Sequence, residues 1–152
     1  MHSNYTFVFF GSDDFSISIL DALCKAGFVP SLVVAPPDRK QGRGMQLTAP
    51  ATKIWAEEHS IEVFQPETLD DNAVSFLKEK IYTWDFFVVA SYGLIIPQTI
   101  LEIPTYGALN VHPSLLPKYR GATPVESAML ADDKETGVTI MLMDNKMDHG
   151  PL

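Results

Sequence analysis

The stretch Tyr5-Thr-Phe-Val-Phe-Phe10-Gly11-Ser-Asp-Asp-Phe15 sets the architecture expected for this chain of 152 residues. Its first six residues are mostly aromatic or β-branched, and they predict a buried strand that ends at Gly11. The polar residues that follow can cap a helix, which we expect to cover 15–26 with its apolar residues on one face. The segment 29–35 then predicts a second strand. This strand–helix–strand order is the unit from which doubly wound parallel sheets are built.

The same alternation continues along the chain. We expect further strands at 61–64, 85–90, 108–112 and 137–143, and further helices at 51–58, 73–81 and 125–129. The segment 36–50 holds three prolines and two glycines and fits no regular element. An irregular stretch of this length inside a compact domain is often functional. The sequence therefore predicts an α/β domain with a Rossmann-like, doubly wound, mainly parallel sheet.

Composition and charge narrow the classes of function. The chain is 46% hydrophobic and 20% charged, which gives one domain enough apolar residues for a real core. Its net charge of −8 disfavours a general nucleic-acid-binding protein, because affinity for phosphates comes mainly from Lys and Arg. Without a long apolar run or a secretory leader, we expect neither a membrane span nor export. The single cysteine, Cys24, fits a reducing compartment.

Several familiar motifs are missing from the sequence. The first strand-to-helix turn has only Gly11 where a dinucleotide-binding turn has three glycines, and the aspartates beside it would repel a pyrophosphate. The chain also lacks the Gly-x-Ser-x-Gly turn of the α/β-hydrolases. No cluster of Cys and His has the spacing of metal ligands, so we expect no bound metal.

A stronger candidate site lies at the end of the strand expected at 108–112. Asn110 and His112 alternate along this strand and therefore project from the same face. They lie at its carboxyl end, where parallel α/β sheets bind their ligands. Two polar groups on one face, followed by a loop stiffened by prolines, favour function over two satisfied core residues. Asp148 is a weaker candidate on spacing alone, because an aspartate before His-Gly also suits a turn.

Four sequence blocks together carry a family resemblance: Phe10–Phe15, Pro37–Gly44, Ala90–Pro97 and Gly107–Gly150. The last block contains Asn-x-His-Pro-Ser-Leu-Leu-Pro-x-Tyr-Arg-Gly and, later, Met-Asp-x-Gly. With these motifs the chain resembles the formyltetrahydrofolate-dependent formyltransferases over essentially its whole length, and above all the members that act on methionyl-tRNA. The resemblance implies that residues 1–152 form most of the Rossmann-like catalytic domain. The family's C-terminal barrel domain, which helps to hold tRNA, is then absent from this truncated chain.

The resemblance also implies a catalytic set, which falls on Asn110, His112 and Asp148. In these enzymes an amine attacks the formyl group on N10 of 10-formyltetrahydrofolate, and negative charge develops on the formyl oxygen. The amide of Asn110 and a protonated His112 would donate hydrogen bonds to that oxygen. Asp148 would orient His112, favour its charged form and help to move the proton of the amine. No metal is implied.

The same resemblance places the folate donor between two segments. The residues implied to border its pocket are Tyr92, Gly93, Leu94 and Ile96 in one segment and Ser114, Leu115, Leu116 and Pro117 in the other. Apolar walls with backbone donors suit a flat pterin ring.

A basic loop points to the acceptor. Arg39, Lys40, Arg43 and Lys53 face only one acidic residue, Asp38, in a chain that is otherwise acidic. Such a local charge favours a targeted phosphate contact. In the related enzymes this loop enters the acceptor stem of tRNA, which implies tRNA contacts by Arg43, Arg39 and Lys40. The usual basic pair after Gly-Arg-Gly is Met-Gln here, so the loop carries less charge than expected.

The expected function is therefore transfer of a formyl group to the α-amino group of methionine on initiator methionyl-tRNA, for translation initiation. We expect a monomer in the bacterial cytoplasm or an organellar matrix. Two alternatives stay open: a sugar-nucleotide or glycinamide-ribonucleotide N-formyltransferase with the same catalytic set, and a non-catalytic module that binds folate or RNA. The intact set of Asn110, His112 and Asp148 speaks against the second.

Overall fold

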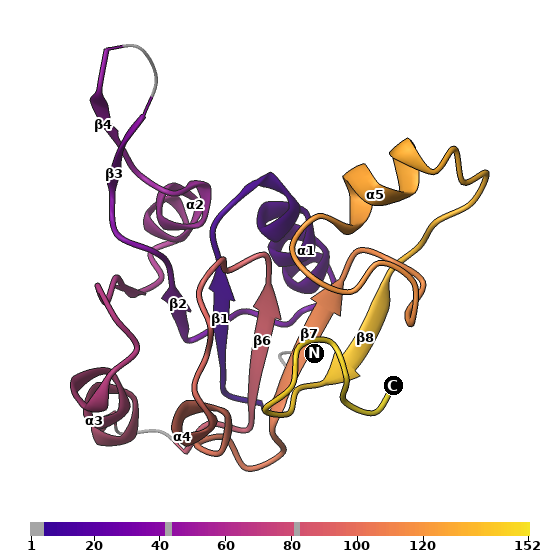
Figure 1. Ribbon diagram of the computed structural model, residues 1–152. Coiled ribbons are helices and arrows are strands. Elements are labelled where there is room, and N and C mark those ends of the chain that lie inside the picture. The colour runs from indigo at the N-terminus through magenta and orange to yellow at the C-terminus, as the bar shows by residue number, and fades with distance from the viewer. Residues whose placement is uncertain (1–4, 42–43, 81–82) are drawn as a thin grey trace.

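A central sheet with helices on both faces organises the computed structural model, which describes residues 5–41, 44–80 and 83–152 (Figure 1). The sheet has the strand order β5-β2-β1-β6-β7-β8. Its strands are β1 (Phe7–Gly11), β2 (Leu32–Val34), β5 (Val63–Phe64), β6 (Phe86–Ala90), β7 (Ala108–His112) and β8 (Thr139–Leu142). The helices are α1 (Asp14–Lys25), α2 (Ala51–Glu58), α3 (Asp71–Glu79), α4 (Gln98–Leu101) and α5 (Pro124–Leu130).

Pairing within the sheet confirms the predicted doubly wound, mainly parallel topology. β1 pairs in parallel with β2 on one side and β6 on the other, and β6 pairs in parallel with β7. Only β8 runs antiparallel, against β7. Parallel strands place their carboxyl ends at one edge, so β1, β6 and β7 all end on the same side of the sheet.

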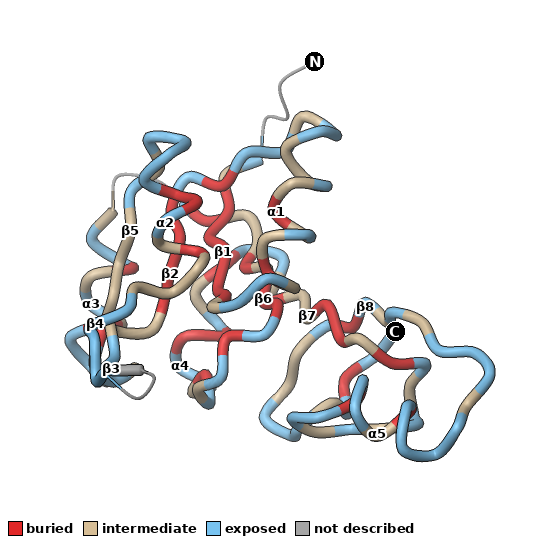
Figure 2. Tube along the Cα trace, turned by 90° about the horizontal axis from the view of Figure 1, so that it is seen from above, coloured by how far each residue is buried: buried red, intermediate tan, exposed pale blue. Residues whose placement is uncertain are grey.

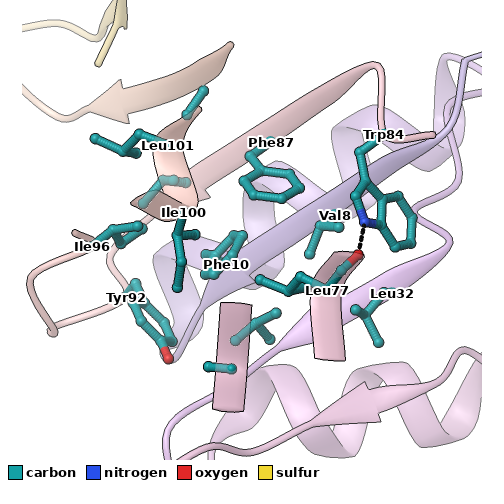
Figure 3. Packing of buried hydrophobic residues seen from close by; sticks show 14 residues of the cluster. Val8, Phe10, Leu32, Leu77, Trp84, Phe87, Tyr92, Ile96, Ile100 and Leu101 are labelled. Atoms are coloured by element: carbon teal, nitrogen blue, oxygen red, sulfur yellow. Dashed lines mark hydrogen bonds between the residues drawn. The ribbon is translucent and has the colours of Figure 1, made fainter. Parts of the chain in front are cut away.

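The core has two halves, one on each face of the sheet. Successive residues of β1 point to opposite faces, so Phe7 and Phe9 pack with α1 and α2, while Val8 and Phe10 pack with α3 and α4. Figure 3 shows the second half, in which Phe10 lies against Phe87 with ring centroids 5.2 Å apart. Figure 2 shows that buried residues concentrate along β1, β2 and β6, whereas α5 is largely exposed. This burial on both faces explains why β1 and β6 read as continuous apolar runs.

The expectation that 36–50 holds no regular element is wrong. β3 (Arg39–Gln41) and β4 (Gln46–Thr48) form a two-stranded antiparallel hairpin, separate from the main sheet. Each strand has three residues, and those of β4 are all exposed, so the hairpin buries no apolar stripe that a sequence pattern could reveal. Arg43 lies outside the described residues.

Other differences concern the ends and lengths of elements. β2 is shorter than the strand expected at 29–35: Val29 is exposed before it, and the buried Ala35 follows its last residue. α3 begins after its N-cap Asp70 and ends at Glu79, while Ile81, expected on the same helix, lies outside the described residues. No sequence pattern predicts α4, since four residues are too few to show helical periodicity.

The turn between β1 and α1 is fastened to the sheet by a buried hydroxyl. Asp13 caps α1 by accepting a hydrogen bond from the backbone N–H of Ser16 at 3.1 Å. The Ser16 hydroxyl donates to the carbonyl of Ala90 at 2.6 Å and accepts from the backbone N–H of Ser12 at 3.0 Å. These bonds tie the first turn to the end of β6, which is the edge where the candidate site lies.

Replacing Ser16 by alanine is expected to lower the free energy of unfolding by about 1–3 kcal/mol, because it leaves buried backbone groups without a partner. Ser18→Ala on the exposed face of the same helix is the matched control and should change it by less than about 0.5 kcal/mol. Urea denaturation of both variants measures the difference. Equal effects of the two substitutions would contradict a fastening role for Ser16.

Candidate active site

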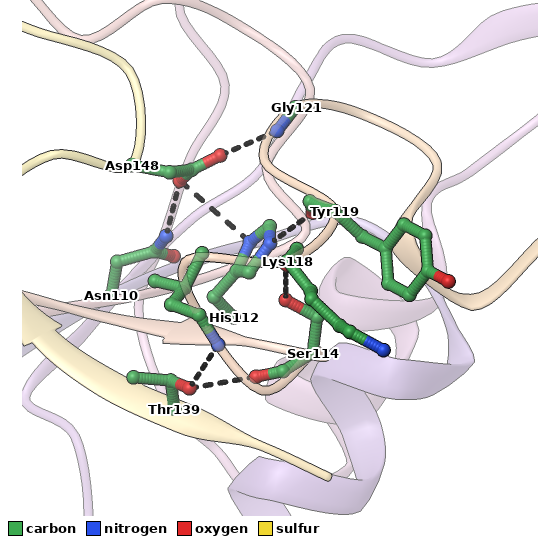
Figure 4. Close-up of polar contacts among 9 residues, drawn as sticks. Asn110, His112, Ser114, Lys118, Tyr119, Gly121, Thr139 and Asp148 are labelled. Carbon is green, nitrogen blue, oxygen red and sulfur yellow. Dashed lines mark hydrogen bonds and ion pairs between the residues drawn. The ribbon is translucent and has the colours of Figure 1, made fainter. Parts of the chain in front are cut away.

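Three polar side chains meet at the carboxyl edge of the sheet. Asn110 and His112 project from the same face of β7, as the sequence predicts, and Asp148 comes from the loop that follows β8 (Figure 4). Because β8 runs antiparallel to β7, the chain returns beside β7 and brings Asp148 to it. The Asp148 Oδ1 atom lies 3.4 Å from the amide nitrogen of Asn110 and 3.6 Å from Nδ1 of His112.

Backbone groups hold the imidazole and the carboxylate in place. His112 is only 4% exposed, and its Nε2 lies 2.9 Å from the carbonyl oxygen of Tyr119. The other oxygen of Asp148 accepts a hydrogen bond from the backbone N–H of Gly121 at 2.7 Å. A carbonyl oxygen only accepts hydrogen bonds, so Nε2 carries a proton when it bonds to Tyr119, and Nδ1 is the nitrogen on the side of Asp148.

A cavity of about 320 Å³ opens directly onto these three groups. Its walls come from β6 and the following loop, from β7, from the chain that leads into α5 and from the loop after β8. The lining residues are Val89, Ser91, Tyr92, Gly93, Leu94, Ile95, Ile96, Asn110, Val111, His112, Pro113, Gly121, Ala122, Pro124, Met143, Met147 and Asp148. Four of the eight residues expected at the donor pocket therefore line the cavity: Tyr92, Gly93, Leu94 and Ile96. The cavity combines apolar walls with a polar end, the usual make-up of a small-molecule site.

The other four residues expected at that pocket do not line this cavity. Ser114 is buried, and its hydroxyl donates to the carbonyl of Lys118 at 2.6 Å. Leu115 borders a separate hollow of about 530 Å³, and Leu116 and Pro117 border neither. The structure thus gives this segment a part in shaping the loop after His112.

The basic hairpin rises above the same edge of the sheet, on the opposite side of it from α5 (Figure 1). Arg39 and Lys40 lie exposed on β3. Lys53 differs from them because it forms an ion pair with Asp38, with Nζ 2.8 Å from the carboxylate. Between hairpin and sheet lies a second cavity of about 310 Å³, which Arg39 lines together with Tyr92. The two cavities therefore share the loop after β6.

Part of the site consists of backbone groups that the sequence does not reveal. The carbonyl of Tyr119 and the N–H of Gly121 contact the candidate catalytic groups, but no side-chain pattern could have revealed them. Met143 and Met147 also line the cavity.

Within residues 5–41, 44–80 and 83–152, no group of three or more His, Cys, Asp or Glu side chains is placed to hold a metal ion. No helix in the same part of the chain has the length and apolar character needed to cross a membrane.

An α/β sheet with an amide, an imidazole and a carboxylate at its carboxyl edge defines a domain suited to group transfer onto or from a carbonyl. The chain belongs to the formyl transferase family, whose model matches residues 4–152. It is 50% identical over 143 residues to a methionyl-tRNA formyltransferase of Neisseria meningitidis and 47% identical over 145 residues to that of Methylobacillus flagellatus. These alignments cover 94% and 95% of this chain but 46% and 47% of the relatives, so the chain spans about half their length.

Solved structures agree on the fold. A phosphoribosylglycinamide formyltransferase from Bacillus halodurans superposes with a TM-score of 0.74 at 28% identity, covering 96% of this chain and 75% of that one. A sugar N-formyltransferase from a Shewanella species gives a TM-score of 0.63 at 18% identity, covering 97% of this chain and 55% of that one. At 18% identity the second likeness concerns the fold alone.

Tyr92 carries an unusual hydroxyl. It is 3% exposed, and no described residue supplies a hydrogen-bond partner for its oxygen. Burial raises the pKa of Tyr92 from 10.0 to about 12. The unfolded chain therefore releases this proton at lower pH than the folded chain does. The contribution of protonated Tyr92 to the free energy of unfolding is fully present below about pH 10 and is lost as the pH rises towards about 12.

Tyr92→Phe is expected to keep or slightly raise stability at pH 7, because it removes a buried hydroxyl without a partner. It should also weaken the loss of stability between about pH 10 and 12. Unfolding free energies at several pH values check both points. The exposed Tyr106 supplies the control, since Tyr106→Phe should leave the alkaline loss unchanged. An unaltered alkaline loss in Tyr92→Phe would contradict the prediction.

Proposed function

We propose that this chain supplies the site at which a formyl group passes from 10-formyltetrahydrofolate to the α-amino group of methionine on initiator methionyl-tRNA. The observation that carries the proposal is the meeting of Asn110, His112 and Asp148 at the polar end of one cavity. The 50% identity to a methionyl-tRNA formyltransferase supports this acceptor. The product serves translation initiation.

The cavity has the features that a folate donor needs. Val89, Leu94, Ile96 and Met143 give it apolar walls for a pterin ring, and the turn at Gly93 has a left-handed backbone with open space beside it. The candidate catalytic groups lie at the polar end, where the formyl group would be placed. Ser114, Leu115, Leu116 and Pro117 would support this pocket indirectly, by shaping the loop behind His112.

Each catalytic side chain has a distinct task in this proposal. When bound, the donor supplies an activated formyl carbon, whose bond to N10 is exchanged for a bond to the acceptor amine. The amide of Asn110 donates to the formyl oxygen as negative charge develops there. His112 lines the same cavity and would donate from Nδ1 when protonated, and the carboxylate of Asp148, 3.6 Å from Nδ1, helps to orient the ring. Asp148 is also positioned to take up the proton that leaves the amine, and N10 takes up one proton as its bond to the formyl carbon breaks.

The rest of the proposed acceptor site lies on the hairpin side. Arg39 and Lys40 are free to meet phosphates, whereas Lys53 is already paired with Asp38. Arg43, the third residue proposed to contact tRNA, lies outside the described residues. The remainder of the tRNA-binding surface, including the barrel domain implied by the resemblance, would lie beyond this chain, in a protein that acts as a monomer.

A glycinamide-ribonucleotide acceptor is the second candidate, because the Bacillus halodurans structure shares this fold. The first strand-to-helix turn argues against this acceptor, because the carboxylates of Asp13 and Asp14 there would repel its phosphate group. A sugar-nucleotide acceptor has little use for a basic hairpin above the site.

Asn110→Ala is expected to lower the rate of formyl transfer by about a hundredfold or more, because it removes a donor to the developing charge. The assay uses the full-length protein, 10-formyltetrahydrofolate and methionine-charged initiator tRNA, and measures formyl-methionine after deacylation. Asn72→Ala serves as the control and should keep the wild-type rate, because Asn72 is exposed on α3 and does not line the cavity.

Parallel assays with glycinamide ribonucleotide and an amino-sugar nucleotide separate the candidates. Turnover only with the tRNA supports the proposal. Turnover only with one of the small acceptors would assign the site to that acceptor, and donor binding without any turnover would leave the non-catalytic module as the function.

Removing the hairpin charges is expected to weaken tRNA binding and its salt dependence. Each lost phosphate contact should reduce the slope of log affinity against log salt by about one, so the Arg39→Gln, Lys40→Gln double variant should lose up to about two. Binding titrations over a range of salt concentrations measure the slope. Lys134→Gln is the control, since Lys134 is exposed and pairs with Asp132 in another part of the molecule. An unchanged slope in the double variant would contradict the contact.

A further inference from the structure

Tyr119 has an unusual backbone beside the candidate catalytic histidine. Its φ of 56° lies in the left-handed region, which a residue with a bulky side chain rarely occupies. This conformation turns the carbonyl of Tyr119 towards His112, where the oxygen lies 2.9 Å from Nε2. Something in the structure must therefore hold Tyr119 in a conformation that it does not prefer.

The side chain of Tyr119 supplies that hold. Figure 4 shows the ring leading away from His112, on the side of Tyr119 opposite to its carbonyl. The phenol donates a hydrogen bond to Oδ2 of Asp133 at 2.8 Å. Asp133 is itself fixed after α5, because its backbone N–H donates to the carbonyl of Ala128 at 3.1 Å. The phenol thus links the residue beside the histidine to the end of a helix.

The preceding part of the loop is fastened separately. The hydroxyl of Thr139 on β8 donates to the carbonyl of Ser114 at 2.7 Å and accepts from the N–H of Leu116 at 3.1 Å. The Ser114 hydroxyl donates to the carbonyl of Lys118 at 2.6 Å. These bonds fix the chain up to Lys118, and the side chain of Tyr119 provides the next attachment.

The contact at Nε2 has a chemical consequence for the ring. A carbonyl only accepts, so Nε2 carries a proton whenever this hydrogen bond forms. Nδ1 is then the nitrogen directed at Asp148, 3.6 Å from its carboxylate. If the carbonyl moved away, the neutral ring could place its proton on either nitrogen, and its orientation would no longer be fixed.

We propose that Tyr119 is a positioning residue for His112, which holds its own carbonyl on Nε2 through the hydrogen bond of its phenol to Asp133. This role rests on the proposed function, in which Nδ1 of His112 serves the formyl group. The link also makes the end of α5 part of the support of the active site, although α5 itself is largely exposed.

Tyr119→Phe in the full-length protein tests the link, because it removes only the phenolic hydroxyl. We expect kcat to fall about tenfold, the lower end of the loss seen when the hydrogen-bond partner of a metal-bound histidine is removed, with the KM of both substrates unchanged. We also expect ¹⁵N NMR to show His112 changing from the Nε2-protonated form to a mixture of tautomers. The His112 signals are assigned by their disappearance in His112→Gln.

Variants of Asp133 separate positioning from simple loss of structure. Asp133→Ala removes the bond to the phenol and also the ion pair of Asp133 with Lys118, 3.2 Å away. Its effect should therefore be at least that of Tyr119→Phe, and the double variant should be no worse than Asp133→Ala alone. Asp133→Asn keeps an oxygen that accepts from the phenol and should keep the Nε2-protonated ring. Tyr106→Phe is the matched control, since Tyr106 is an exposed tyrosine on another loop.

Two outcomes would overturn the proposal: a wild-type His112 tautomer with wild-type kcat in Tyr119→Phe, or fully additive effects of the Tyr119 and Asp133 variants. The NMR measurement requires no substrate. It therefore reports on the positioning of His112 even if the assays of formyl transfer fail, which keeps a failure of this inference distinct from a failure of the proposed function.

Discussion

The parallel pairing of β6 with β1 on one side and β7 on the other is the constraint on which the rest of the structure depends. Both faces of this central part are covered by helices, so its side chains must be apolar and its polar groups can emerge only at the ends of the strands. The end of β7 therefore holds Asn110 and His112, beside the loop that leaves β6. The site therefore lies at the carboxyl ends of the central strands, where their side chains are no longer covered by helices.

Much of this architecture could be predicted from the sequence, because buried parallel strands leave continuous apolar runs such as 7–10 and 86–90. The alternation of Asn110 and His112 along β7 likewise placed both on one face. The hairpin β3–β4 could not be predicted, since its short, exposed strands depend on backbone pairing with each other. Nor could α4, which is too short for a periodic pattern.

The side chains of the candidate site could be predicted from the sequence, but their backbone partners could not. Its side chains are visible in the sequence, and the family resemblance pointed to Asp148, whose own spacing is weak. The backbone partners are not visible: the carbonyl of Tyr119 and the N–H of Gly121 act through the path of the chain rather than through residue type. Of the expected pocket residues, the loop after β6 lines the cavity, while the segment Ser114–Pro117 takes part in shaping the turn behind His112.

The self-contained pairing of β3 with β4 has a consequence for how such a domain can diversify. The hairpin contributes no strand to the main sheet, and its register is set only between its own two strands. Insertions or changes of charge there leave the register of β1, β6 and β7 intact, and with it the spacing of Asn110, His112 and Asp148. Under the proposed function, selection of the acceptor and the chemistry of transfer would therefore lie in separate parts of one small fold, free to evolve at different rates.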